Sequence, residues 1–303
     1  MTKEKGNPVY KLAAIDIGSN AGRLLIANVY QFHGIPKINK LQLVRVPLRL
    51  GEEVFSNNKL SPDKIQQLVR SVHAFKLLME AYGVDEFRAC ATSAMRESEN
   101  REEVVQAIKS ACDVEVEVID GKKEADLILN TFLTQDIEKS HHYLYIDVGG
   151  GSTEISLIYD DKKIASHSFR LGTLRLMNEQ DDKSEWKRLK NWLKELKING
   201  VETTAIGTGG NINKLYKLSD VNRKSKIMFR DELKAISKYV KSHSFEERVE
   251  LLGLRPDRAD VIVPAAKIYL SVLKYAAIER MIVPKIGLAD GIAYDLYCKL
   301  TAD

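Results

Sequence analysis

The pattern of apolar and polar positions along the chain includes one arrangement that occurs twice. A short apolar run leads into Asp, Gly and Ser or Thr, first as LAAIDIGSN at residues 12–20 and again as LYIDVGGGSTE at residues 144–154. Two further apolar runs follow each copy: RLLIANVY and KLQLVRVPL in the first, EISLIYD and KKIASHSFRL in the second. Runs of this length bounded by turn residues are typical of strands. We predict that each half opens with three antiparallel strands.

Helical patterns follow each set of strands. Residues 61–83 carry Ser61 at an N-cap position, Pro62 at the first helical position and Gly83 as a stop. A second helix is expected to start near Asn100, with Glu103 at the spacing of a capping box. Residues 183–197 form an amphipathic helix with its lysines on the solvated face.

Further strands are expected between the helices, at FRACATS, at VEVEVI (residues 114–119) and at TTAIG, and several helices between residues 230 and 300. Strands alternating with helices predict an α/β fold in which each half has a mixed sheet with a parallel part. We place the first domain at residues 1–125 and the second at 126–303. The C-terminal helix near residues 290–303 is a candidate to pack back on the first domain.

Composition narrows the setting of the protein. The chain has 303 residues, 44% hydrophobic and 29% charged, which is an ordinary soluble globular mixture. Three cysteines without a CxxC spacing favour a reducing compartment, the cytoplasm. The polar N-terminus MTKEKGNPVYK is unlike a signal peptide, and no apolar run approaches the ~18 residues of a membrane span. A net charge of +4 suits either steering of anionic substrates or solubility, and does not predict nucleic-acid binding.

The repeated motif predicts phosphate binding. A glycine-rich turn exposes consecutive backbone N–H groups that can hold an anion, and Ser19, Ser152 and Thr153 add hydroxyl donors. A strand follows where a P-loop or a dinucleotide fingerprint would have a helix, so neither of those applies. Asp16 and Asp147 end their strands beside the turns, and a carboxylate next to phosphate needs a cation between them, such as Mg²⁺ or another divalent ion. The alternative is a plain hairpin with a capping Asp.

Longer stretches of the sequence resemble those of one protein family. The stretches AAIDIGSNAGRLLI, CATSAMRESENR, IDGKKEADLI, YIDVGGGSTEISLI, RLGTLRL, AIGTGGNINKL and RPDRADVIVPAAKIYLSVL come in one order over nearly the whole chain. In this order they resemble the exopolyphosphatase/guanosine pentaphosphate phosphatase (Ppx/GppA) family of the actin-like ATPase superfamily. The resemblance implies two actin-like (ribonuclease H-like) domains with a phosphate-binding cleft between them. It implies a phosphoanhydride hydrolase that removes terminal phosphate from polyphosphate or from guanosine pentaphosphate.

The resemblance also assigns roles to residues. It implies Glu124 as the general base that activates water, and Asp147 and Glu154 as ligands of Mg²⁺. Without the resemblance, the position of Glu124 in the first turn of its helix favours a role in complementing the helix dipole. The phosphate-binding positions that it implies are Asp16, Gly18, Ser19, Asn20, Arg49, Arg96, Gly149, Gly150, Gly151, Ser152, Thr153, Gly209 and Gly210.

The chain departs from the family pattern at Lys123, Asn211 and Ala289, where the family usually has Glu, Thr and Arg. The 303 residues contain no His-Asp dipeptide of the HD-type domain that long members carry, so we expect a short, two-domain form with a preference for short chains or a nucleotide. Two alternatives stay open: a non-catalytic binder of polyphosphate or an alarmone, and an ATP-dependent kinase of the same fold. A homodimer is compatible with the sequence.

Two adjacent histidines, His141 and His142, suggest a metal pair, but their polar loop favours a structural role.

Overall fold

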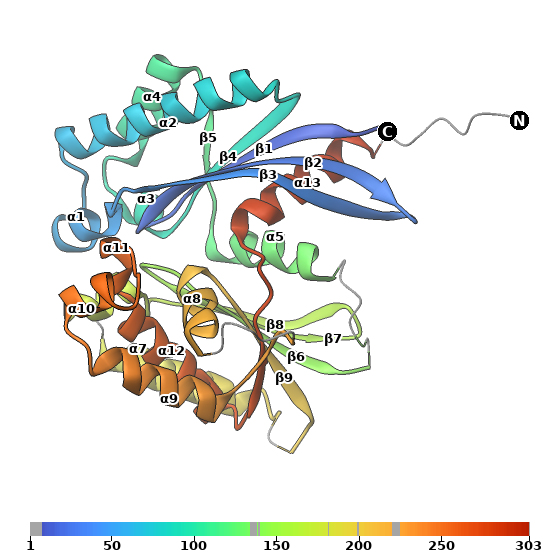
Figure 1. The fold of residues 1–303 in the computed structure, drawn as a ribbon, viewed down its shortest axis with the longest axis vertical. Coiled ribbons are helices and arrows are strands. Elements are labelled where there is room, and N and C mark those ends of the chain that lie inside the picture. Colours follow the sequence, from blue (N-terminus) through green and yellow to red (C-terminus); the bar gives the residue numbers. More distant parts are fainter. Residues whose placement is uncertain are drawn as a thin grey trace, which may run out of the picture. The chain divides into compact units, whose positions relative to one another are not determined.

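The chain forms two structural units. The computed structural model describes residues 8–133, 138, 140–180, 182–198, 200–219 and 225–302. Met1–Asp136 and Gly287–Asp303 together belong to the first compact unit, and Ile137–Ile286 belong to the second. The first unit runs from blue to green in Figure 1 and includes the red C-terminal helix.

The first unit is a five-stranded sheet with helices on it. Its strands are β1 (Tyr10–Ile17), β2 (Ala21–Phe32), β3 (Ile35–Pro47), β4 (Glu86–Ala91) and β5 (Val116–Val118), in the order β3-β2-β1-β4-β5. Its helices are α1 (Leu50–Asn57), α2 (Pro62–Tyr82), α3 (Ser93–Glu97), α4 (Arg101–Cys112), α5 (Gly121–Leu133) and α13 (Leu288–Leu300). β1 pairs antiparallel with β2 and parallel with β4.

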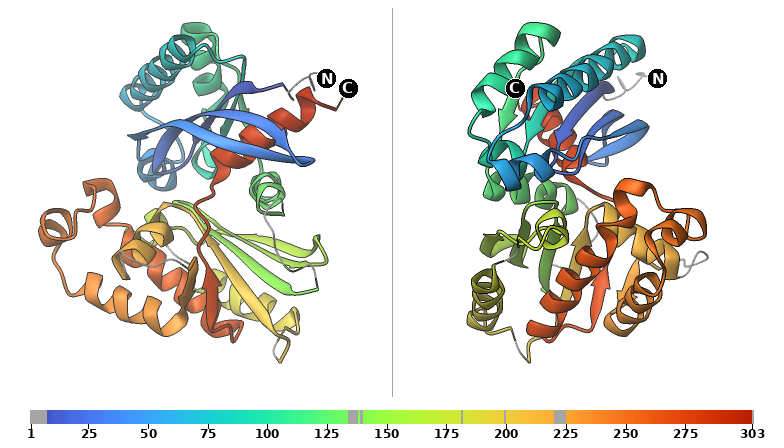
Figure 2. Two further views of the ribbon diagram at one scale, coloured as in Figure 1. Left: turned by 45° about the vertical axis from the view of Figure 1, so that its right-hand side comes forward. Right: turned by 90° about the vertical axis from the view of Figure 1, so that its left-hand side faces the viewer.

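The central strand β1 is buried on both faces. Ala13, Ile15 and Ile17 belong to one core with residues of α2 and α4, and α13 packs against β1 and α5. Both views of Figure 2 show α13 lying along this sheet. A strand covered on both faces requires a continuous apolar run, which explains why LAAIDI does not alternate.

The second unit repeats this sheet. Its strands are β6 (His142–Val148), β7 (Thr153–Tyr159), β8 (Lys162–Phe169), β9 (Thr203–Thr208), β10 (Ile227–Phe229) and β11 (Arg280–Ile282), in the order β10-β11-β9-β6-β7-β8. Its helices are α6 (Thr173–Met177), α7 (Lys183–Glu195), α8 (Gly210–Ser219), α9 (Arg230–Lys241), α10 (Phe245–Glu250), α11 (Pro256–Ala259) and α12 (Ile262–Tyr275). Except for the edge strand β10, each strand has a counterpart in the first sheet, and β6 corresponds to β1.

Several predicted elements are found and others differ. α2 has the predicted cap at Ser61 and ends at Gly83, which has a φ of 60°. The capping box at Asn100 does not form, because the Asn100 side chain instead exchanges hydrogen bonds with the Leu60 backbone. β5 covers only part of the predicted strand at 114–119. The short strands β10 and β11 have no counterpart among the predicted elements.

The units divide the chain later than the sequence-based boundary at residue 125. The physical reason is that α5 packs on α13, and both helices therefore belong to the first unit. No helix within the described ranges combines the length and the apolar character needed to cross a membrane.

Candidate active site

The second glycine loop, residues 149–152, is held in place by hydrogen bonds to its backbone carbonyl groups. The backbone N–H groups of Thr173 and Leu174, at the start of α6, donate to the carbonyls of Gly149 and Gly150 at 3.0 and 2.9 Å. The Nε of the buried Arg175 donates to the carbonyl of Gly151 at 2.8 Å. Since the carbonyls are held on one side, the N–H groups of Gly150, Gly151 and Ser152 remain for a ligand; no carbonyl in the described residues accepts them. This arrangement of donors can bind an anion.

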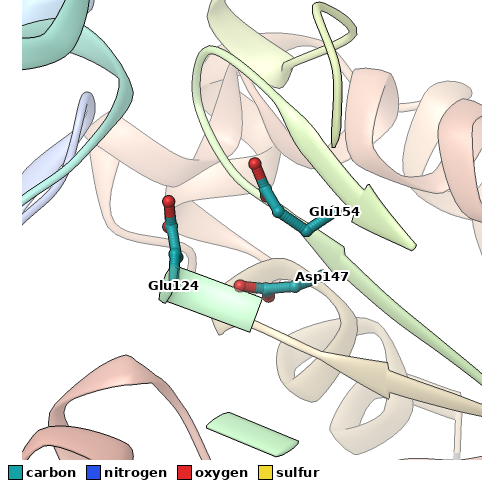
Figure 3. A group of neighbouring side chains, drawn as sticks. All are labelled: Glu124, Asp147 and Glu154. Carbon is teal, nitrogen blue, oxygen red and sulfur yellow. The ribbon is translucent and has the colours of Figure 1, made fainter. Parts of the chain in front are cut away.

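Two carboxylates lie beside this loop. Asp147 and Glu154 are directly opposite each other in the antiparallel register of β6 and β7, so both side chains project from the same face of the sheet. Their carboxylate oxygens lie within 4.8 Å of one another. Figure 3 shows the two side chains as neighbours. Both residues are largely enclosed, and two enclosed carboxylates at this distance repel each other unless a cation lies between them.

Hydroxyl groups orient both carboxylates. Ser152 Oγ and Ser168 Oγ donate to Glu154 Oε1 at 2.6 and 3.0 Å, and Thr208 Oγ1 donates to Asp147 Oδ1 at 2.9 Å. Oxygen ligands of this kind suit a hard divalent cation. The residues present therefore fit a metal site.

The third glycine turn lies next to Asp147. β6 and β9 are parallel, and their registered ends place Thr208 opposite Asp147. Gly209 has a φ of 105°, a backbone that favours glycine, and a Cβ there would make a tight contact of 3.2 Å with Asp147 Oδ1. Helix α8 begins at Gly210, and its free N–H groups start beside the same edge of the sheet.

The first glycine loop, residues 18–20, lies beside a carboxylate that is paired with a basic side chain, unlike the carboxylate pair beside the second loop. Asp16 at the end of β1 corresponds to Asp147, but its partner in the register is Arg23, whose Nη1 donates to Asp16 Oδ2 at 2.6 Å. Asp16 is therefore neutralised within its own unit. Ser19 Oγ is buried without a hydrogen-bond partner in the described structure, which suits a hydroxyl reserved for a ligand.

The other predicted residues of the first unit lie close to this loop or to one another. The N–H of Arg49 donates to the carbonyl of Asn20 at 3.0 Å, and Arg49 has a φ of 53°, a strained backbone for a side chain of this kind. Arg96, in α3, donates through Nη1 to Glu124 Oε2 at 3.0 Å. Glu124 is buried in the first turn of α5 (Figure 3), where it forms an ion pair with the Arg96 guanidinium.

Sequence reasoning missed the residues that support the loops. Gly172 has no room for a side chain, because a Cβ would lie 2.3 Å from the carbonyl oxygen of Gly150. Arg175 is buried and anchors the loop through its hydrogen bond to the carbonyl of Gly151. The stretch RLGTLRL stands out as a motif, but its short spacing gives no sign of what it contacts.

The adjacent histidines and one buried cysteine make contacts that support the fold. His141 Nε2 is hydrogen-bonded to Thr204 Oγ1 at 2.8 Å, and the His142 ring stacks on Tyr159. Burial and the nearby Arg280 lower the pKa of His141. Burial raises the pKa of Cys90 to about 12, which keeps this thiol protonated.

Comparisons with known proteins agree with these motifs. The model of the Ppx/GppA phosphatase family matches residues 26–300. The chain is 26% identical to exopolyphosphatase 1 of Mycobacterium tuberculosis, covering 93% of this chain and 87% of that one. It is 22% identical to the guanosine-5'-triphosphate,3'-diphosphate pyrophosphatase of Vibrio vulnificus, over 100% of this chain and 62% of that one.

The fold is similar to solved structures as well. The crystal structure of the Aquifex aeolicus member of the Ppx/GppA family superposes with a TM-score of 0.77 at 26% identity. The match covers 97% of this chain and 99% of that one. The two mixed sheets described above thus correspond to a two-domain actin-like fold.

Proposed function

Because the chain belongs to the Ppx/GppA phosphatase family, we propose that it is a phosphoanhydride hydrolase that releases terminal phosphate from inorganic polyphosphate, from guanosine pentaphosphate, or from both. Relatives bearing the names of both activities support this choice of substrates. Both substrates carry a terminal phosphoryl group joined through an anhydride oxygen and surrounded by negative charge.

The observation that carries the proposal is the second glycine loop beside the Asp147–Glu154 pair. The loop offers N–H donors to the oxygens of a phosphoryl group, and the carboxylates would hold Mg²⁺ or a similar divalent ion. When bound, such an ion offsets the charge of the phosphate oxygens. Neither feature alone identifies a phosphatase, but donors and a cation site at one end of one sheet suit a charged phosphate chain.

We assign the hydrolytic step to water and Glu124. A water oxygen attacks the terminal phosphorus, its proton passes to the Glu124 carboxylate, and the bridging P–O bond breaks with the oxygen remaining on the shortened chain. Arg96 donates to Glu124 Oε2 and so orients the carboxylate that accepts the proton. Asp16, Gly18, Ser19, Asn20 and Arg49 of the first loop contribute further contacts to the phosphate chain. In this assignment the buried, unpartnered Ser19 hydroxyl is a donor to phosphate.

The test is phosphate release from polyphosphate, guanosine pentaphosphate and ATP, each with and without Mg²⁺. We expect Mg²⁺-dependent release from at least one of the first two, and slower release from ATP. Tight binding of polyphosphate without any release would instead support the non-catalytic binder. The departures from the family pattern at Lys123, Asn211 and Ala289 are the reason for considering that alternative. A cytoplasmic location and a homodimer remain predictions from the sequence.

A further inference from the structure

A second concave surface of the second unit has the chemistry of an anion site. A groove of about 410 Å³ lies between α9 and α12 and reaches α6, which α12 contacts. Figure 1 shows α9 and α12 in the second unit. Its lining includes the apolar side chains of Leu176, Val263 and Leu270, here called the apolar floor, and the ammonium-bearing side chains of Lys241, Lys267 and Lys274.

The charge of this groove is one-sided. Its lining, drawn from the described residues, contains no Asp or Glu, and no carboxylate in those residues pairs with Lys241 or Lys274. The Lys267 ammonium lies 5.1 Å from the centre of the Trp186 ring. Lys241 and Lys274 in one groove, without an acidic partner among the described residues, attract an anion, while the apolar floor favours a ligand with an apolar body.

We propose that this groove binds a small organic phosphate of nucleoside monophosphate size, and that its occupancy is transmitted to the second glycine loop. The volume lies within the ~300–1,000 Å³ of ordinary small-molecule sites. The lysines would contact the phosphate, and the floor would contact the base or sugar. A nucleoside monophosphate has no phosphoanhydride bond, so it is a ligand of this groove and not a substrate of the proposed reaction.

The route to the loop is short and passes through contacts already described. Leu176 of the floor belongs to α6, and the first residues of α6 hold the carbonyls of Gly149 and Gly150. On α12, Tyr269 donates a hydrogen bond to the carbonyl of Thr208, whose hydroxyl donates to Asp147. A ligand that changes how α6 or α12 packs would therefore change both the loop donors and the carboxylate that we assign to the metal.

The binding half is tested by calorimetric titration of the full chain with GMP and with AMP. Guanosine and inorganic phosphate serve as probes of the apolar and anionic halves alone. The double variant Lys241→Glu/Lys274→Glu is compared with Lys234→Glu/Lys238→Glu, which makes the same charge change on α9 outside the groove lining. We expect saturable binding of a nucleotide in the parent and the control, weakened about 10-fold or more in the groove variant.

Absence of saturable binding in the parent, or equal binding in both double variants, overturns the proposal. Binding of inorganic phosphate as tight as that of GMP removes the role of the apolar floor. Thermal melting of each variant verifies that it is folded, and Lys241→Ala/Lys274→Ala replaces the reversal if it is not.

The proposed transmission from the groove to the second glycine loop rests on the proposed function. We expect saturating GMP to change the rate of phosphate release from polyphosphate in the parent and control, but not in the groove variant. If GMP changes the rate equally in the groove variant, it acts at the glycine loops, and the transmission is wrong. If GMP binds without changing the rate, transmission is again wrong. If no protein releases phosphate, the proposed function fails while the calorimetry still decides the groove.

Discussion

At the scale of residues, the two aspartates that end equivalent strands lie beside opposite charges. Asp16 is opposite Arg23, whereas Asp147 is opposite Glu154. The duplicated motif therefore does not carry duplicated chemistry. Of the two copies, the second places two carboxylates together, so we place the proposed metal site there.

This contrast predicts different outcomes for matched substitutions. Asp147→Asn keeps an oxygen that can accept from Thr208 but removes the charge, so apparent Mg²⁺ affinity in phosphate release should fall on the order of 10-fold or more. Asp16→Asn removes the charge that pairs with Arg23, so it should lower the melting temperature and reduce turnover through the first loop, but leave the apparent Mg²⁺ affinity near the parent value. Identical Mg²⁺ titrations for parent and Asp147→Asn would refute the assignment.

Glu124 is tested by Glu124→Gln, which keeps the size and the acceptor for Arg96 but removes the base. If Glu124 takes the proton of the attacking water, turnover should fall by roughly 10²-fold or more, with substrate binding retained. If it serves only the start of α5, the change should cost under about 1 kcal/mol of stability and leave turnover near normal. Initial rates and melting curves of the two proteins separate these outcomes.

At the scale of elements, α6 is the support of the second glycine loop. Gly172→Ala would push its Cβ against the backbone of Gly150 and Gly151, which cannot move without moving the loop. We expect a loss of about 1–3 kcal/mol in stability and a marked loss of phosphate release. Gly287→Ala is the control, since a Cβ there meets no atom within 4 Å. Activity of Gly172→Ala equal to that control would mean that α6 does not hold the loop.

The start of β6 gives the second unit a dependence on pH. The pKa of His141 is lowered in the folded protein by burial and by Arg280, so the unfolded chain, with an ordinary pKa of ~6.5, binds the proton first. The free energy of unfolding is therefore expected to decline as pH falls through ~6.5. His141→Gln should flatten this decline, and the exposed His73→Gln should not. Chemical denaturation at several pH values between 5 and 8 provides the comparison; equal slopes would contradict the prediction.

At the scale of the whole molecule, one unit is continuous in sequence and the other is not. Residues 137–286 contain one complete hydrophobic core, whereas the first unit needs α13 from the end of the chain to cover β1 and α5. We expect a fragment of residues 137–286 to melt cooperatively. A fragment of residues 1–136 should gain a cooperative melt only when a peptide of residues 287–303 is added. A cooperative melt of 1–136 alone would show that α13 is dispensable.

Much of this protein follows from local sequence. The apolar runs fix the three opening strands of each half, Ser61 and Gly83 bound α2, and the Gly-rich turns mark both loops, because propensity, caps and turn geometry act over a few residues. The sequence also predicts that the C-terminal helix packs back on the first domain, and α13 does so. The tertiary structure alone decided that Arg23 neutralises Asp16 and that Gly172 and Arg175 hold the second loop. These are contacts set by strand register and packing between segments, and no local pattern specifies which partner a side chain meets.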